Sequence, residues 1–267
     1  GIPVVLVNAR LSARSAAGYA RVRGLTAATL KCLQRIAAQS RADAERLTAL
    51  GAPAERVQVT GSIKFDMRIP ASLTEQAAVL RRDWGMQRPV WVAASTHEGE
   101  DELALEAHRR VRERYPQALL VLVPRHPERF ARVAALCREQ GWNTVLRSEQ
   151  MPTPADAAVF VGDSMGELLL FFGACDIAFI GGSLIPHGGH NPLEASAQRI
   201  PVLLGPHMFN FEQIAQLLLE AGAAREVGDG GMLADGVLRW LDDPSARSNA
   251  GERGAAVVEA NKGARDA

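Results

Sequence analysis

The sequence lacks three features that would place it in other classes of protein. No apolar run approaches the roughly 20 residues of a membrane-spanning helix, and no signal-peptide pattern is present. Lysine plus arginine and aspartate plus glutamate number 30 each, so the basic excess typical of a nucleic-acid binder is absent. The three cysteines, Cys32, Cys137 and Cys175, have no paired spacing. They fit a reducing compartment and give no metal motif.

Strand-like and helical patterns alternate along most of the 267 residues. The apolar runs expected as strands are Val4–Val7, Arg35–Ala38, Val57–Thr60, Val90–Ala94, Leu119–Val123, Val159–Val161, Ile177–Ile180 and Val202–Leu204. Between many of them, apolar residues recur at helical spacing, as at Leu103, Ala107 and Val111. This alternation predicts an α/β fold with doubly wound parallel sheets. Ligands of such sheets bind beyond the carboxyl ends of the strands.

A domain boundary is expected between residues 61 and 89. Residues 1–60 supply about three strands, which suits the tail of an N-terminal domain. Residues 61–89 are interpreted as a linker and an entry helix, residues 90–250 as a complete second domain and residues 251–267 as a shortened helix. Because the chain starts with Gly1 on a strand-like run and ends within a helical pattern, we expect it to be a piece of a longer protein.

The glycine-rich stretch from Gly181 to Glu194 is the most informative part of the sequence. It follows an expected strand and precedes an expected helix, and it contains Gly182, Ser183 and His190. Glycines let a ligand approach the backbone, and N–H groups at a helix start can bind an anion. The spacing matches neither the dinucleotide nor the P-loop fingerprint, so the loop predicts only a general anion site.

Two other loops that follow strands carry polar side chains. In Ser95–Glu100, Ser95 or Thr96 could cap the next helix, which would explain every polar residue of this loop except His97. In Pro124–Arg129, Arg125 stands between two prolines, and its planar guanidinium suits a phosphate or carboxylate. An exposed loop arginine without a ligand is the alternative.

Three further signals are ambiguous. Ser164 with Glu167 reads first as a capping box, although Gly166 is unusual inside a first helical turn. Lys64 lies at the expected domain junction, where a solvated charge is an equally good interpretation. Five of the six histidines fall in loops after strands, but none has a partner at metal-ligand spacing, so we predict no metal site.

Five ordered motifs resemble the family of 3-deoxy-D-manno-octulosonic acid (Kdo) transferases, from Gly1 to about Glu259. They are Val7–Ser12, Gly61–Asp66, Ser95–Glu100, Pro124–Arg129 and Gly188–Glu194. The resemblance implies a two-domain glycosyltransferase-B fold and a role in lipopolysaccharide synthesis. The implied reaction is the inverting, metal-independent transfer of Kdo from CMP-Kdo to a lipid A precursor (lipid IVA). It implies no cofactor, no nucleic-acid partner and a location at the cytoplasmic face of the inner membrane.

The same resemblance assigns roles to individual residues. The residues implied to hold CMP are Pro124, Arg125, Met165, Gly166, Glu167, Asn191, Pro192, Leu193 and Glu194. Lys64 is implied to stabilise the transition state, and further candidates for the site are Ser95, His97, Gly182, Ser183 and His190.

The family's general base and membrane anchor are expected outside this chain. The chain alone is therefore expected to bind nucleotide without transferring sugar. Two alternatives stay open at this stage, a nucleotide-sugar epimerase of the same fold and a non-catalytic nucleotide-binding module.

Overall fold

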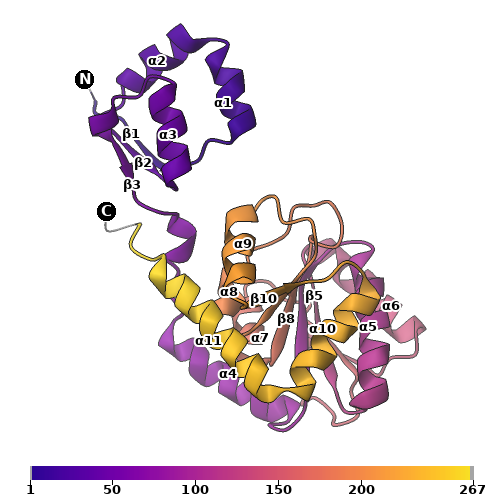
Figure 1. Ribbon diagram of the computed structural model, residues 1–267. Coiled ribbons are helices and arrows are strands. Elements are labelled where there is room, and N and C mark those ends of the chain that lie inside the picture. The colour runs from indigo at the N-terminus through magenta and orange to yellow at the C-terminus, as the bar shows by residue number, and fades with distance from the viewer. Residues whose placement is uncertain (1, 265–267) are drawn as a thin grey trace. The chain divides into compact units, whose positions relative to one another are not determined.

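A computed structural model describes residues 2–264 of the chain (Figure 1). It divides into two compact units. The smaller unit comprises the residues up to Arg68 together with those from Glu259 onward, and the larger unit comprises Ile69–Val258. The division falls within the expected boundary region of residues 61–89. The expected entry helix belongs to the larger unit, and the end of the chain belongs to the smaller one.

The smaller unit is built on a three-stranded parallel sheet in the order β1-β2-β3. Its elements are β1 (Val5–Ala9), α1 (Ala13–Ala20), α2 (Arg23–Lys31), β2 (Arg35–Ala38), α3 (Arg41–Ala49), the 3₁₀ turn η1 (Ala54–Arg56), β3 (Val57–Val59) and the 3₁₀ turn η2 (Ile63–Phe65). Its core gathers Leu11, Ile36 and Leu47. Strand β1 is poorly covered, since Val5 and Val7 keep 55% and 65% of their surface exposed.

The larger unit contains a seven-stranded, wholly parallel sheet in the order β10-β9-β8-β4-β5-β7-β6. The strands are β4 (Val90–Thr96), β5 (Leu119–Pro124), β6 (Thr144–Leu146), β7 (Val159–Val161), β8 (Ile177–Ile180), β9 (Val202–Leu204) and β10 (Ala224–Glu226). All eight strands expected from the sequence are confirmed within two residues at each end. The two that were not expected, β6 and β10, are three-residue strands at the edges of the sheet.

Helices cover both faces of this sheet (Figure 1). They are α4 (Ala71–Trp84), α5 (Glu100–Arg114), α6 (Phe130–Glu139), α7 (Leu168–Ala174), α8 (Leu193–Ser196), α9 (Glu212–Glu220), α10 (Gly230–Asp242) and α11 (Pro244–Ala260), with 3₁₀ turns η3 (Pro127–Arg129) and η4 (Arg147–Glu149). One face packs β4, β5 and β8 against α5, α6 and α10 around Trp91, Leu120 and Phe179. On the other face, Trp84 of α4 contacts the rings of Phe160 and Phe171. Every residue of β4 and β5 is buried, as a sheet covered on two sides requires.

Two helix caps suggested by the sequence are not formed. Helix α5 has Gly99, not Ser95 or Thr96, at its N-cap, and no side chain bonds the cap. Helix α7 begins at Leu168, so Ser164 and Glu167 form no capping box there. Gly166 therefore lies in a turn before the helix, with φ of +81°, where glycine is the favoured residue.

The thiols of the three cysteines differ in exposure. Cys32 of the smaller unit is exposed, while Cys137 and Cys175 of the larger unit are buried. Burial raises the pKa of the Cys137 thiol to about 12 and raises that of Cys175 as well. Among residues 2–264, no helix combines the length and apolar character needed to cross a bilayer.

Candidate active site at the carboxyl ends of the strands

The loops that follow β4, β5 and β8 meet at one edge of the larger sheet. The chain leaves β7 on one side of β4 and returns as β8 on the other side, so the strand order reverses beside β4. Such a reversal opens a crevice at the carboxyl ends of the strands, where α/β proteins bind ligands. The sequence predicts a site at the carboxyl ends of the strands, and the strand order favours the same position.

Strand β4 and the glycine-rich loop approach each other closely at this edge. Ser95 has a φ of +56°, and the pairing of β4 with β5 is irregular between Ala94 and Thr96. The backbone N–H of Gly181 donates to the carbonyl of Ala94 at 2.7 Å. A Cβ on Gly181 would lie 2.5 Å from the carbonyl oxygen of Ser95, so only glycine fits this crossing.

A buried carboxylate, that of Glu100 on the first turn of α5, fixes the glycine-rich loop. Its residue is fully buried, and Oε2 accepts the N–H groups of His97 and Gly182 at 3.0 and 2.6 Å. Oε1 accepts the N–H groups of Ser183 and Leu184, each at 3.0 Å. Four backbone donors thus surround one anion, an arrangement that stabilises its charge without a cation.

This arrangement corrects one expectation about the loop. The N–H groups of Gly182 and Ser183 bind an internal carboxylate, so they are not available to a ligand anion. Ser183 is fully buried, and its hydroxyl donates to the carbonyl of Ile180 and accepts the N–H of Gly205. These two candidates therefore shape the loop and do not offer it to a ligand.

A second network holds the loop that carries Arg125. The Arg125 N–H donates to the carbonyl of Thr96 at 3.0 Å, and the guanidinium of Arg129 donates to the same oxygen at 2.7 Å. Arg129 also pairs with Asp101, whose carboxylate accepts the hydroxyl of Thr96 at 2.6 Å. Burial raises the pKa of Asp101, while Thr96 and Arg129 oppose that shift. The Arg125 backbone is therefore tied to the end of β4.

A cavity of about 340 Å³ opens between these loops. Its lining residues are Ala94, Ser95, Arg125, Leu168, Phe172, Ile180, His190, Asn191, Glu194 and Phe211. Five of them are site candidates from the sequence, drawn from the loops after all three strands. Within residues 2–264, no carboxylate forms an ion pair with Arg125, so its charge can serve a ligand. The cavity has the size of a small-ligand site.

The segment Asn191–Glu194 forms one wall of this cavity. The amide of Asn191 donates to Glu194 Oε1 at 3.3 Å, while its oxygen accepts the N–H of Leu193 at 3.1 Å. Burial raises the pKa of Glu194, and the Asn191 bond opposes the shift. Pro192 and Leu193 are buried and are not among the residues that line the cavity.

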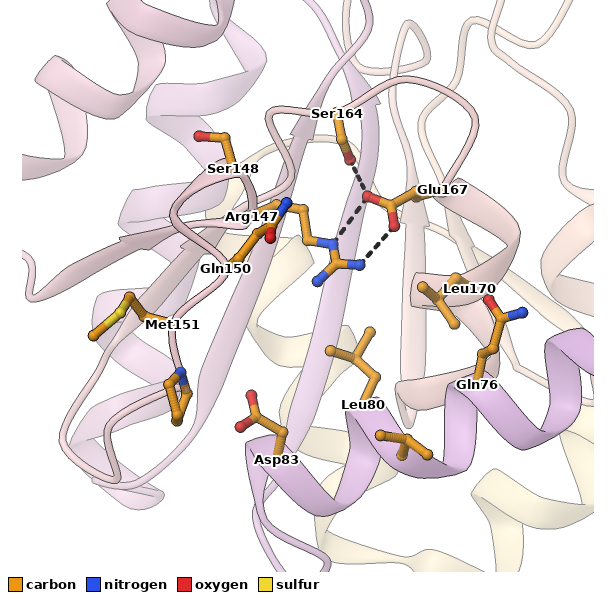
Figure 2. Close-up of a pocket in the computed structure, with 12 residues that line it drawn as sticks. Gln76, Leu80, Asp83, Arg147, Ser148, Gln150, Met151, Ser164, Glu167 and Leu170 are labelled. Carbon is orange, nitrogen blue, oxygen red and sulfur yellow. Dashed lines mark hydrogen bonds and ion pairs between the residues drawn. The ribbon is translucent and has the colours of Figure 1, made fainter.

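The remaining acidic candidate lies in a different cavity, of about 760 Å³ (Figure 2). There Glu167 accepts two hydrogen bonds from the Arg147 guanidinium, at 2.9 and 2.7 Å, and one from Ser164. The Arg147 bond is the main cause that lowers the pKa of Glu167. Of the nine implied CMP residues, three line the 340 Å³ cavity and only Glu167 lines the larger one, while the other five line neither.

Nine of the candidates line neither cavity, among them Pro124, Met165, Gly166 and Lys64. Pro124 ends β5 and is buried, while Met165 is 60% exposed and Gly166 has open space around its Cα. Lys64 belongs to the smaller unit, where burial, and to a lesser extent Arg10, lowers the pKa of its amine. Its role beside the others stays a prediction.

The structure brings four of the histidines together. The imidazole of His97 lies 2.8 Å from that of His190, measured between their Nε2 atoms, and stacks on His187 with ring centroids 4.1 Å apart. His126 meets His97 edge-on at 5.4 Å. Across the part of the chain that the structure describes, no three His, Cys, Asp or Glu side chains are arranged to hold a metal ion.

Sequence reasoning missed the partners that fix these candidates. The motif Ser95–Glu100 contains Glu100 without a role for it, and no motif includes Arg147 or Asp101. Glu100 reaches 82 to 84 residues along the chain to the glycine-rich loop, and nothing local marks that contact. The short spacing from His97 to Glu100 was the one available signal.

Known proteins similar to this chain identify its family. A family described as 3-deoxy-D-manno-octulosonic-acid transferase (kdotransferase) matches residues 1–67. The transferase of that name from Haemophilus influenzae is 43% identical over 264 residues. That alignment covers 98% of this chain and 62% of the relative, so the chain spans about three fifths of its length.

Two solved structures extend the comparison. The C-terminal CMP-Kdo binding domain of WaaA from Acinetobacter baumannii is 33% identical, with a TM-score of 0.68 over 71% of this chain and 100% of that domain. A UDP-GlcNAc 2-epimerase from Neisseria meningitidis, 15% identical, shares the fold with a TM-score of 0.59 over 97% of this chain and 67% of its own.

The parallel sheets and the cavity at the strand ends define a protein of glycosyltransferase-B type. Within that class, the chain belongs to the family of 3-deoxy-D-manno-octulosonic acid transferases, which confirms the resemblance carried by the motifs.

Proposed function

We propose that the larger unit binds CMP-Kdo, the sugar donor of a Kdo transferase. The observation that carries this proposal is the cavity in which Arg125, Asn191 and Glu194 meet, in a unit similar to the CMP-Kdo binding domain of the Acinetobacter protein. Arg125 supplies the cation for the donor phosphate, and Glu194 supplies a carboxylate that can accept hydrogen bonds from ribose hydroxyls.

The reaction proposed for the whole protein is transfer of Kdo to a lipid A precursor, lipid IVA, with inversion and without a metal or cofactor. The departing group is an anionic phosphate, and a fixed cation favours its departure. Arg125 would serve this role in the donor cavity, and Lys64 is proposed as a further stabiliser of the transition state.

The general base that deprotonates the acceptor is proposed to lie outside this chain. The chain alone would then bind donor without transferring sugar. The full-length protein is proposed to associate peripherally with the cytoplasmic face of the inner membrane.

Calorimetric titration with CMP tests the donor assignment. Arg125→Ala should weaken CMP binding by about 10- to 150-fold, because a charge-assisted hydrogen bond is worth about 1.5–3 kcal/mol. Glu194→Gln should weaken it less, since a neutral amide still accepts hydrogen bonds. Arg132→Ala is the matched control, because that side chain is 67% exposed and pairs only with exposed Glu98 among the ion pairs described. Unchanged affinity in Arg125→Ala would contradict the assignment.

The choice of nucleotide separates this proposal from an epimerase of the same fold. A Kdo transferase should bind CMP more tightly than UMP, and an epimerase acting on a uridine-linked sugar should show the reverse order. Titration of the same preparation with both nucleotides decides between them. Transfer activity is then assayed with the complete reading frame, CMP-Kdo and a lipid A precursor.

A further inference from the structure

His97 and His190 form a hydrogen-bonded pair of imidazoles. Their Nε2 atoms are 2.8 Å apart and their rings are coplanar to within 2°. One Nε2 must donate and the other must accept, so the neutral pair has a single proton between the two rings. In that state only one of the two Nδ1 atoms carries hydrogen. One added proton leaves the shared bond intact and makes both Nδ1 atoms donors.

Both members of this pair have fixed positions. His97 is buried, and its backbone N–H donates to the carboxylate of Glu100. The ring of His187 stacks on that of His97. His190 lines the 340 Å³ cavity together with Arg125. His190 is therefore the member that faces ligand space, and His97 holds it from behind.

The surroundings keep the pair neutral while the cavity holds no anion. Burial, and after it the charges of neighbouring histidines, lowers the pKa of His97 to about 4. Burial, followed by the charge of Arg125, lowers the pKa of His190 to about 4. The charged and titratable groups that face the pair are Arg125, His126, Arg129, His187, Glu100 and Glu194. A ligand anion next to His190 would offset the cationic neighbours and favour the protonated pair.

We propose that the His97–His190 pair binds the phosphate of a nucleotide in this cavity and takes up one proton as the phosphate binds. His190 contacts the ligand, and His97 is a positioning residue that retains the shared proton. The inference rests on the proposed function, because it needs a nucleotide phosphate beside Arg125. It adds a proton-linked anion contact to the cationic contact of Arg125, so nucleotide affinity should rise as the pH falls from 8 towards 5.

Calorimetry with cytidine 5′-phosphate methyl ester measures this proton directly. Its single phosphate charge does not titrate near neutrality, unlike the second ionisation of a phosphate monoester near pH 6. Binding heats at pH 6 in two buffers of different ionisation enthalpy give the number of protons taken up. The unmodified chain should take up a substantial fraction of one proton. His190→Gln and His97→Gln should take up close to none, because glutamine keeps hydrogen-bonding atoms but does not titrate.

His207→Gln is the matched control, since His207 lies on the loop after β9 and lines a different cavity. It should take up as much proton as the unmodified chain. Binding without proton uptake in the unmodified chain, or undiminished uptake in His190→Gln, overturns this inference and leaves the donor site standing. Failure of the unmodified chain to bind any cytidine nucleotide overturns both. If one variant does not fold, the uptake of the unmodified chain and the other variant still decide.

Discussion

The same local arrangement, an acidic side chain that bonds a distant backbone N–H, occurs in both units but in different surroundings. In each unit, the strand that comes first in the sequence has a non-glycine residue with positive φ near its end. These residues are Asn8 in β1 and Ser95 in β4. In each, an acidic residue on the first turn of a helix bonds the backbone after a neighbouring strand. Asp43 of α3 accepts the N–H of Leu11 at 2.8 Å, and Glu100 of α5 accepts three N–H groups of the glycine-rich loop.

The two carboxylates differ in how many distant backbone N–H groups each one accepts. Asp43 accepts one distant backbone donor, and Ser40 and Arg46 complete its surroundings. Among the described residues, Glu100 is fully buried and has only backbone donors around it, in the loops at the carboxyl ends of the strands. The larger unit therefore depends on burial and on complete hydrogen bonding, while the smaller unit tolerates an exposed first strand. This contrast shows where a substitution will be costly.

The largest effect should come from truncating a leucine in a strand. Leu120→Ala in β5 removes a fully buried side chain and should lower the free energy of unfolding by about 2–5 kcal/mol. Leu6→Ala in β1 is the matched change, and with 37% exposure it should cost about 1 kcal/mol or less. Urea denaturation followed by circular dichroism measures both. Equal losses would contradict the contrast between the sheets.

Replacing the buried carboxylates should give the next largest effect. In Glu100→Gln the amide nitrogen faces backbone donors, so at least one N–H loses its acceptor, at a cost of about 2–4 kcal/mol. In Asp43→Asn the amide can donate to Ser40 while its oxygen keeps Leu11, so the cost should be below about 1 kcal/mol. Glu98→Gln, at a 70% exposed position, should leave unfolding within about 0.5 kcal/mol. Denaturation curves of the three variants test this order.

The smallest effect concerns pH and should arise in the larger unit, which contains all six histidines. Burial lowers the pKa of His108 to about 3, and its ring bonds Trp91 and the carbonyl of Ala158. Because this value is below the unfolded one of about 6.5, its contribution is complete above pH 6.5. It is lost at about 1.4 kcal/mol per pH unit as the pH falls towards 3.

The pH effect is tested by unfolding at pH 7.0 and 5.5 with tryptophan fluorescence, since all four tryptophans also lie in the larger unit. Between these two pH values the unmodified chain should lose about 1.2 kcal/mol through His108, and His108→Gln should lack that loss. An unchanged slope would mean that His108 becomes protonated inside the fold.

The sequence predicts the sheets well because their strands are short apolar runs bounded by turns. It misses β6 and β10, whose three residues at the sheet edges carry too little pattern. It suggests helix caps at Ser95 or Thr96 and at Ser164 that the structure does not form, because capping rules are local. Tertiary structure determines the conformation at both positions. The pairing of β4 with β5 is irregular between Ala94 and Thr96, and Glu167 pairs with Arg147.

In the candidate site, too, local motifs predict some features and tertiary contacts determine the others. The family motifs indicate Arg125, Asn191 and Glu194, and the structure gathers these three residues at one cavity. The motifs do not reveal that Glu100 accepts N–H groups of the glycine-rich loop or that His97 pairs with His190. Those contacts join segments more than 80 residues apart, so only the folded chain shows them.

Cys32 and the tryptophans give this chain one optical reporter in each unit. A maleimide dye should react with exposed Cys32 and spare buried Cys137 and Cys175, without any mutation. The dye would follow the smaller unit, while the natural indole emission follows the larger one. A single melting experiment with two detection channels could then show whether the units lose structure together or in sequence.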